Sequence, residues 1–119
     1  MNKTFRFFEF KVYKDSKMFY SNIVKITKKF PREYWEIADQ MRRSSLSVCL
    51  NIAEGAGKES DKDFNRYLNN SLGSINETAA GIDISYQESL INLKAKDLLL
   101  KEAKEIANQL GGFSKKLKR

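Results

Sequence analysis

Apolar side chains recur along this chain every three or four residues, the spacing that places them on one face of an α-helix. Val12, Phe19 and Ile23 are the first to show it, and lysines occupy the opposite side of the same segment. No segment alternates between apolar and polar residues for long, as a half-buried β-strand does. The pattern therefore predicts four long helices, near residues 11–29, 32–56, 61–90 and 94–117.

The ends of these segments carry residues that begin and end helices. Pro31 suits the first turn of a helix, and Gly55 suits the end of the second segment. Ser60 and Asp63 have the spacing of a capping box at the start of the third segment. Connections of only a few residues join long helices as antiparallel neighbours. We therefore expect a single all-α domain over residues 1–119, an antiparallel up-down-up-down four-helix bundle.

The predicted core consists of the apolar residues at these helical spacings. We expect burial of Phe19, Ile23, Ile37, Met41, Val48, Ile52, Phe64, Ile75, Ile82, Ile106 and Leu110. The Phe-rich segment before residue 11 is expected to pack on the end of the bundle or on a neighbouring subunit.

The second helix is apolar on two sides. Besides its core stripe, Trp35, Leu46 and Leu50 form a second stripe, rotated by roughly 150° around the helix. A four-helix bundle buries only one side of each helix. The second stripe therefore faces another copy of the chain, or it is covered by the Phe-rich N-terminus or by a bent neighbouring helix. We interpret it as the interface of a homo-oligomer.

Positive charge is concentrated at the two ends of the sequence. The net charge is +7, and residues 1–30 hold eight Lys/Arg and two Asp/Glu, while residues 93–119 hold eight and three. The first and last helices are neighbours in the predicted topology, so their lysines would form one basic surface that suits the phosphates of nucleic acid. The alternative is that these lysines only solvate the outer helix faces. The candidate nucleic-acid-binding residues are Lys11, Lys14, Lys17, Lys25, Lys28, Lys94, Lys101, Lys104 and Lys115.

The composition leaves few catalytic or metal-binding chemistries open. The chain has no histidine, and its one cysteine, Cys49, lies in an apolar stretch without a neighbouring base. The Gly-Ala-Gly-Lys run at 55–58 lacks the spacing of a phosphate-binding loop. Acidic pairs such as Glu33 and Glu36 lie at helix starts, where they favour the positive end of the helix dipole. We therefore expect no catalytic residue, no metal and no cofactor, and a protein that is not an enzyme.

No segment has the pattern of a targeting or membrane sequence. The first residues mix phenylalanines with Lys3, Arg6 and Glu9, whereas a secretory signal needs an uninterrupted apolar stretch. The charge-free stretch at 44–53 is about half as long as a membrane-spanning helix. The expected location is the cytoplasm, with no membrane contact.

Arg42 and Arg43 form a basic pair in the middle of the second helix. Arginine pairs either contact phosphates or pair with carboxylates of a neighbouring helix. In the second case, the expected partners are Glu77 or Asp83 of the third helix.

Several short motifs are distributed over most of the chain. They are Phe30-Pro31, Gln40-Met-Arg-Arg-Ser-Ser-Leu-Ser-Val48, Asn51-Ile-Ala-Glu-Gly55, Gly57-Lys58 with Ser60, Phe64, and Gly73-Ser74 with Glu77. Together they resemble the bacterial four-helix-bundle family whose members include proteins encoded within intervening sequences of 23S ribosomal RNA genes. Ser44 departs from the alanine that is more usual there, and Phe10-Lys-Val-Tyr13 departs from a Leu-x-Val-Trp-like string.

The resemblance implies a ring-like assembly and no known chemistry. Members of the family are mostly four-helix bundles, several are homopentamers, and no catalytic activity is established for them. A related branch is similar to the accessory protein of diversity-generating retroelements, a basic pentameric barrel that binds nucleic acid and a reverse transcriptase. Arg42, Arg43, Asn51, Glu54 and Gly55 match the family motif without an implied role, although Asn51 and Glu54 would also suit a helix cap.

Two functions follow as expectations. The first is a non-catalytic oligomer that binds RNA or an RNA–DNA intermediate without sequence specificity. The second is a protein–protein adaptor whose basic surface docks an enzyme such as a reverse transcriptase. The lysine faces carry no known RNA-binding motif and no aromatic stacking platform, so we expect any nucleic acid to be bound through its phosphates.

Overall fold

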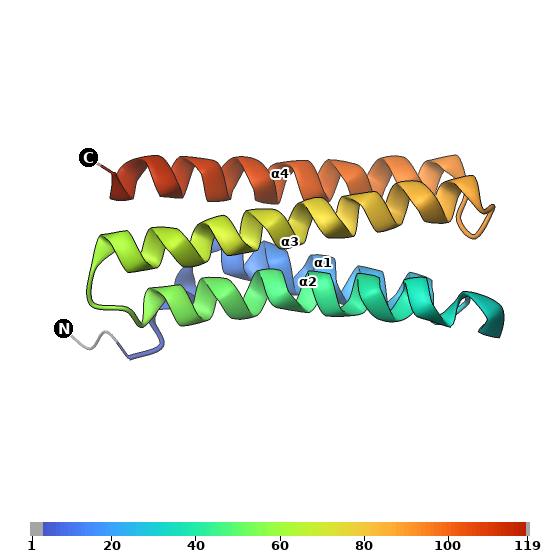
Figure 1. Ribbon diagram of the computed structural model, residues 1–119. Coiled ribbons are helices and arrows are strands. Elements are labelled where there is room, and N and C mark those ends of the chain that lie inside the picture. The colour runs from blue at the N-terminus through green and yellow to red at the C-terminus, as the bar shows by residue number, and fades with distance from the viewer. Residues whose placement is uncertain (1–3, 119) are drawn as a thin grey trace.

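The computed structural model describes residues 4–118 and consists mainly of four long helices. Figure 1 shows these helices lying side by side along a common axis. No residue from 4 to 118 is in a β-strand, and the predicted all-α, up-down four-helix bundle is confirmed. Residues 1–3 and 119 of the predicted domain lie outside the described residues. The helices are α1 Lys11–Thr27, α2 Trp35–Ala56, α3 Asp61–Gln87 and α4 Leu93–Leu117.

The helix boundaries differ from the predicted ones where the backbone leaves the helical region. The chain is extended at Pro31 (ψ 154°), and the residues that follow form a short 3₁₀ helix, η2 (Arg32–Tyr34), before α2 begins. At the end of α3, Ser89 has a left-handed backbone (φ 61°), and the Leu90 N–H donates to the Ser85 carbonyl (2.9 Å). This closing bond ends α3 earlier than the apolar pattern predicts. The predicted cap is present, because the Asp63 N–H donates to Ser60 Oγ (3.1 Å).

Each helix packs against its neighbours in the chain, and α1 also packs against α4. The two ends of the chain and the α2–α3 connection lie at the same end of the bundle, as Figure 1 shows. Every predicted core residue is buried except Ile37. That prediction was wrong because Ile37 lines an open groove between α2 and α3, which leaves it only half-buried.

Small and hydroxylated side chains pack between α2 and α3. Ser44 Oγ and Thr78 Oγ1 share a hydrogen bond of 2.6 Å, and Ser71 Oγ donates to a backbone carbonyl of α2 (3.0 Å). A Cβ on Gly81 would lie 2.5 Å from Met41 Cγ, so the α3 backbone rests directly on that side chain. These residues bring the two helix axes close together.

The Phe-rich N-terminal segment closes one end of the bundle. It forms a 3₁₀ helix, η1 (Arg6–Glu9), from which the Arg6 guanidinium donates to the Ala56 carbonyl at the end of α2 (3.2 Å from Nη2). Phe10 stacks with Phe64 of α3, with ring centroids 6.4 Å apart. The expectation that this segment packs on the end of the bundle is confirmed.

Candidate nucleic-acid interface

The helices that carry the excess positive charge lie next to each other. Asn22 of α1 donates to both carboxylate oxygens of Glu102 of α4 (3.1 Å each). Gln109 of α4 donates to Asp15 of α1 (2.8 Å). These polar contacts join α1 to α4, the two helices that carry the candidate lysines.

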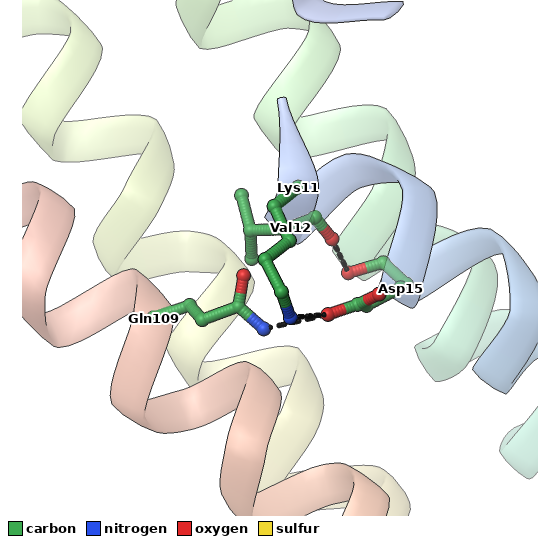
Figure 2. Close-up of polar contacts among 5 residues, drawn as sticks. Lys11, Val12, Asp15 and Gln109 are labelled. Atoms are coloured by element: carbon green, nitrogen blue, oxygen red, sulfur yellow. Dashed lines mark hydrogen bonds and ion pairs between the residues drawn. The ribbon is translucent and has the colours of Figure 1, made fainter. Parts of the chain in front are cut away.

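Asp15 is the best-connected acidic residue on this side. Figure 2 shows Lys11 and Gln109 converging on it from α1 and α4, and the Lys11 Nζ to Asp15 Oδ2 distance is 2.7 Å. The hydrogen bond from the Lys11 ammonium lowers the pKa of Asp15 below its ordinary value of 3.8, against the opposing effect of partial burial. The same hydrogen bond raises the pKa of Lys11 above 10.5. Asp15 therefore joins the two helices as a carboxylate, and it neutralises Lys11.

The candidate lysines are all exposed, and most are unpaired. Within residues 4–118, Lys11 pairs with Asp15 and Lys14 lies 3.4 Å from Glu9, while Lys17 lies over the ring of Tyr13. The candidate lysines without an ion pair among the described residues are Lys17, Lys25, Lys28, Lys94, Lys101, Lys104 and Lys115.

The surface between α1 and α4 is not uniformly basic. A shallow groove of about 190 Å³ between them is lined by Asp15, Glu102 and Glu105 as well as by Lys11. The sequence suggests one continuous basic surface, but the structure places these carboxylates between the two sets of lysines. Helical periodicity assigns them to the flank of each helix, and only the pairing of α1 with α4 brings them together.

The second apolar stripe of α2 is open to solvent. Trp35 is 67% exposed, Leu50 57% and Leu46 38%, so neither the N-terminal segment from residue 4 onward nor a neighbouring helix covers them. The alternative in which this chain covers the stripe itself is wrong. The interface between copies stays a prediction.

The two arginines of α2 do not pair with the expected carboxylates. Arg42 Nε donates to Thr27 Oγ1 of α1 (2.9 Å), and Arg43 Nε pairs with Asp39 one turn earlier in α2 (3.0 Å). The predicted partners were wrong because Arg42 and Arg43 lie on the α1 side and the outer side of α2, away from α3. Asp83 instead pairs with Lys96 of α4 (3.3 Å).

The Asn-Ile-Ala-Glu-Gly motif has structural roles that the sequence does not reveal. A Cβ on Gly55 would lie 2.7 Å from Tyr67 Cβ, so glycine permits the close approach of α3. The Asn51 side chain does not cap the helix, because its amide donates to Ser47 one turn earlier (2.9 Å), and Ser47 also accepts from Ser74 of α3. Glu54 is exposed and lines a pocket beside the N-terminal segment.

An acidic groove lies on the opposite side of the bundle, between α2 and α3. It encloses about 480 Å³, its floor includes Ile37 and Ile84, and its rim includes Glu33, Glu36 and Glu77. The sequence does not predict this groove, because its residues belong to two helices and each helix has the pattern of an ordinary amphipathic segment.

Other chemistry has little support in the described residues. Burial raises the pKa of the Cys49 thiol to about 11, so it is protonated at neutral pH and is a poor nucleophile. No group of three Asp, Glu, Cys or His side chains between residues 4 and 118 is placed to hold a metal ion. In the same range, no helix is both long enough and apolar enough to cross a membrane.

Comparison with known proteins identifies the family. No curated protein matches the chain. A crystal structure of a protein with unknown function from the S23 ribosomal protein family of Bacteroides thetaiotaomicron is similar over 87% of this chain and 98% of its own, with 27% sequence identity and a TM-score of 0.81. The family model of the 23S rRNA-intervening sequence protein matches residues 9–112, which include all but the ends of the bundle. The chain therefore belongs to the family of 23S rRNA-intervening sequence proteins.

Proposed function

We propose that this chain is a non-catalytic, oligomeric bundle that binds the phosphates of RNA or DNA through the side formed by α1 and α4. The division of charge across the bundle is the observation that supports this most. Residues 1–30 and 93–119 together hold sixteen Lys/Arg and five Asp/Glu, whereas residues 31–92 hold six and ten. A small domain needs a net charge of only about 2–8 for solubility. The net charge of +7 lies within that range, so it is the uneven division of the charge between the helices that favours nucleic acid, the common ligand of basic surfaces.

The exposed lysines of α1 and α4 favour contact with phosphates and not with base edges. Lys25, Lys28, Lys101 and Lys104 are exposed and have no ion pair among the described residues. Lysine contacts to phosphates position a nucleic acid without reading its bases. The carboxylates in the groove between α1 and α4 repel phosphates, so the strand would follow the outer lysines. Binding is then independent of sequence.

Self-association would multiply these contacts. The exposed stripe of Trp35, Leu46 and Leu50 is the proposed interface between copies, and the resemblance to ring-forming relatives favours five subunits. Repeating one basic side around a ring adds weak phosphate contacts through multivalency. Leu50→Glu should therefore lower the mass measured by light scattering toward the 13.8 kDa of one chain without loss of helicity. A parent protein that already has the mass of one chain would contradict the oligomer.

A matched pair of double variants tests the binding surface. Lys25→Gln with Lys101→Gln removes two charges from the α1–α4 side, and Lys58→Gln with Lys62→Gln removes two from the α2–α3 connection and the start of α3. The probes are fluorescently labelled RNA and DNA oligonucleotides, and the measurement is anisotropy between about 50 and 200 mM salt.

The two variants should behave differently although their net charges are equal. The first should weaken binding to every sequence and reduce the slope of log affinity against log salt, by just under one for each phosphate that the variant no longer neutralises. The second should bind like the parent. Equal effects of the two variants, or no binding by the parent at about 50 mM salt, would remove the support for a phosphate-binding side.

The acidic groove supports a second candidate function, an adaptor that docks its partner through this groove and not through the basic surface considered from the sequence. Its apolar floor and its rim of Glu33, Glu36 and Glu77 suit a protein segment that presents both apolar and basic side chains. This observation favours the adaptor, with an enzyme such as a reverse transcriptase as the partner. Ile84→Lys, at the floor of the groove, should then abolish co-purification with a reverse transcriptase from the same genome while nucleic-acid binding is unchanged.

A further inference from the structure

A cluster of aromatic rings lies outside the helical core, immediately before and at the start of α1. Phe5 and Phe8 are stacked, with centroids 5.5 Å apart and planes at 24°, and Phe8 is stacked with Tyr13 at 6.3 Å and 27°. Phe7 meets all three edge-on and packs against the buried core. Phe7 therefore fixes the cluster to the bundle, while Phe5 and Phe8 remain 62% and 52% exposed.

The backbone that carries these rings is held in an uncommon shape. Phe5 has a left-handed conformation (φ 56°), which bulky residues rarely adopt. The hydrogen bond from Arg6 to the Ala56 carbonyl fastens the next residue to the end of α2. The left-handed conformation of Phe5 is energetically costly, and it leaves the rings of Phe5 and Phe8 exposed to water instead of burying them. Such conformations are typical of ligand-binding positions.

A cation of α1 lies against Tyr13, the half-buried ring of the cluster. Lys17 Nζ is 5.0 Å from the centroid of Tyr13, and Lys14 projects from the same end of α1, where Glu9 partly neutralises it. Aromatic rings next to lysines are the arrangement by which proteins hold single strands, because unpaired bases stack on the rings while phosphates contact the cations. A duplex keeps its bases stacked inside and presents mainly its backbone.

We propose that the exposed rings of Phe5 and Phe8 stack on unpaired bases, so that this protein prefers single-stranded RNA or DNA to duplex. The inference rests on the proposed nucleic-acid binding and adds the class of strand that is bound. Stacking on phenyl rings tolerates every base, so the preference is for strandedness and not for sequence.

The experiment compares three labelled probes of equal length: a single strand, its duplex, and an abasic strand that has phosphates but no bases. Phe5→Leu with Phe8→Leu removes the rings but keeps apolar side chains at both positions. Tyr86→Leu is the matched control, because Tyr86 is also partly exposed beside a lysine, with Lys96 Nζ 4.5 Å from its ring, on a different part of the bundle. Affinities come from anisotropy, and subunit mass from light scattering.

The parent should bind the single strand more tightly than the duplex or the abasic strand. Phe5→Leu with Phe8→Leu should weaken single-strand binding about 5- to 100-fold, while duplex and abasic binding and the salt slope stay unchanged. Tyr86→Leu should change none of them.

Two results would overturn the stacking role and leave the proposed phosphate binding intact. One is a parent that does not prefer the single strand; the other is an unchanged single-strand affinity in the Phe5→Leu, Phe8→Leu variant. A change in subunit mass in that variant would instead assign the cluster to contacts between copies, and would overturn the inference. Failure of the parent to bind any probe at about 50 mM salt would reject both the inference and the proposed function.

Discussion

Gly81 is the point at which the packing of α2 on α3 can be tested most directly. An alanine Cβ there would lie 2.5 Å from Met41 Cγ and 3.3 Å from Met41 Sδ. Carbon atoms in contact normally lie about 3.5–4.0 Å apart. Met41 is only 1% exposed, and its Sδ accepts a hydrogen bond from Ser85 Oγ (3.4 Å), so moving the side chain disrupts its packing and this contact. Gly81→Ala must therefore push the two helices apart or force Met41 out of its preferred rotamer.

Two opposing effects set the size of the change. Alanine in place of glycine inside a helix stabilises by about 1 kcal/mol, and overpacking a buried site costs about 1–3 kcal/mol. Gly73 lies in the same helix with nothing within 4 Å of its Cβ position, so Gly73→Ala gains the first effect without the second. We expect Gly73→Ala to raise the free energy of unfolding by about 1 kcal/mol and Gly81→Ala to lower it by up to about 2 kcal/mol.

Urea denaturation followed by far-UV circular dichroism measures both values. The two variants and the parent are compared at one protein concentration, because association of subunits contributes to the apparent stability. The quantity that isolates the contact is the difference between the two alanine variants, expected to be about 1–3 kcal/mol. If both alanines stabilise the protein equally, α3 does not rest on Met41 as described.

Three further outcomes follow from single residues. The lowered pKa of Asp15 favours its ionised form in the folded state, so its stabilisation is present above the ordinary pKa of 3.8 and is lost as the pH falls through the folded-state pKa. In urea titrations, Asp15→Asn should lower the free energy of unfolding near neutral pH, and the difference from the parent should shrink as the pH falls through that folded-state pKa; a difference independent of pH would contradict this. Ser89→Gly should raise the free energy of unfolding by about 1 kcal/mol, because glycine adopts the left-handed backbone at the end of α3 without a steric penalty, and a loss of stability would show that the serine side chain is needed. Cys49 is buried, and the pKa of its thiol is raised to about 11. A thiol reagent should therefore leave Cys49 unmodified in the folded protein near neutral pH and modify it in denaturant. Rapid modification without denaturant would contradict its burial.

Helical periodicity was enough to predict the bundle, because burial in a helix pair depends mainly on which face a residue occupies. It was not enough where a helix face opens onto a groove. Ile37 has the spacing of a core residue but lies where α2 and α3 leave space between them. The end of α3 also differs from the pattern, since Leu90 continues the apolar spacing after the backbone has turned at Ser89.

The candidate site was less predictable because it depends on side chains from separate segments. The lysines could be assigned to outer faces from the sequence, but the carboxylates of Asp15 and Glu105 meet only when α1 packs on α4. Phe5 and Phe8 precede the first helix, where no period indicates their direction. A sequence signal was present nonetheless, because residues 5–10 include four phenylalanines.

The hydroxyl groups buried between α2 and α3 also determine how far one helix can slide along the other. A shift of one turn, about 5.4 Å, would separate the Ser71 and Ser74 hydroxyls from their partners on α2. Leaving the buried Ser71 hydroxyl unpaired would cost about 1–3 kcal/mol. Two helices joined only by aliphatic side chains would resist such a shift far less. The polar contacts thus fix the axial register of α3. Because Phe64 belongs to that helix and stacks on Phe10, they also fix where the N-terminal segment meets the bundle.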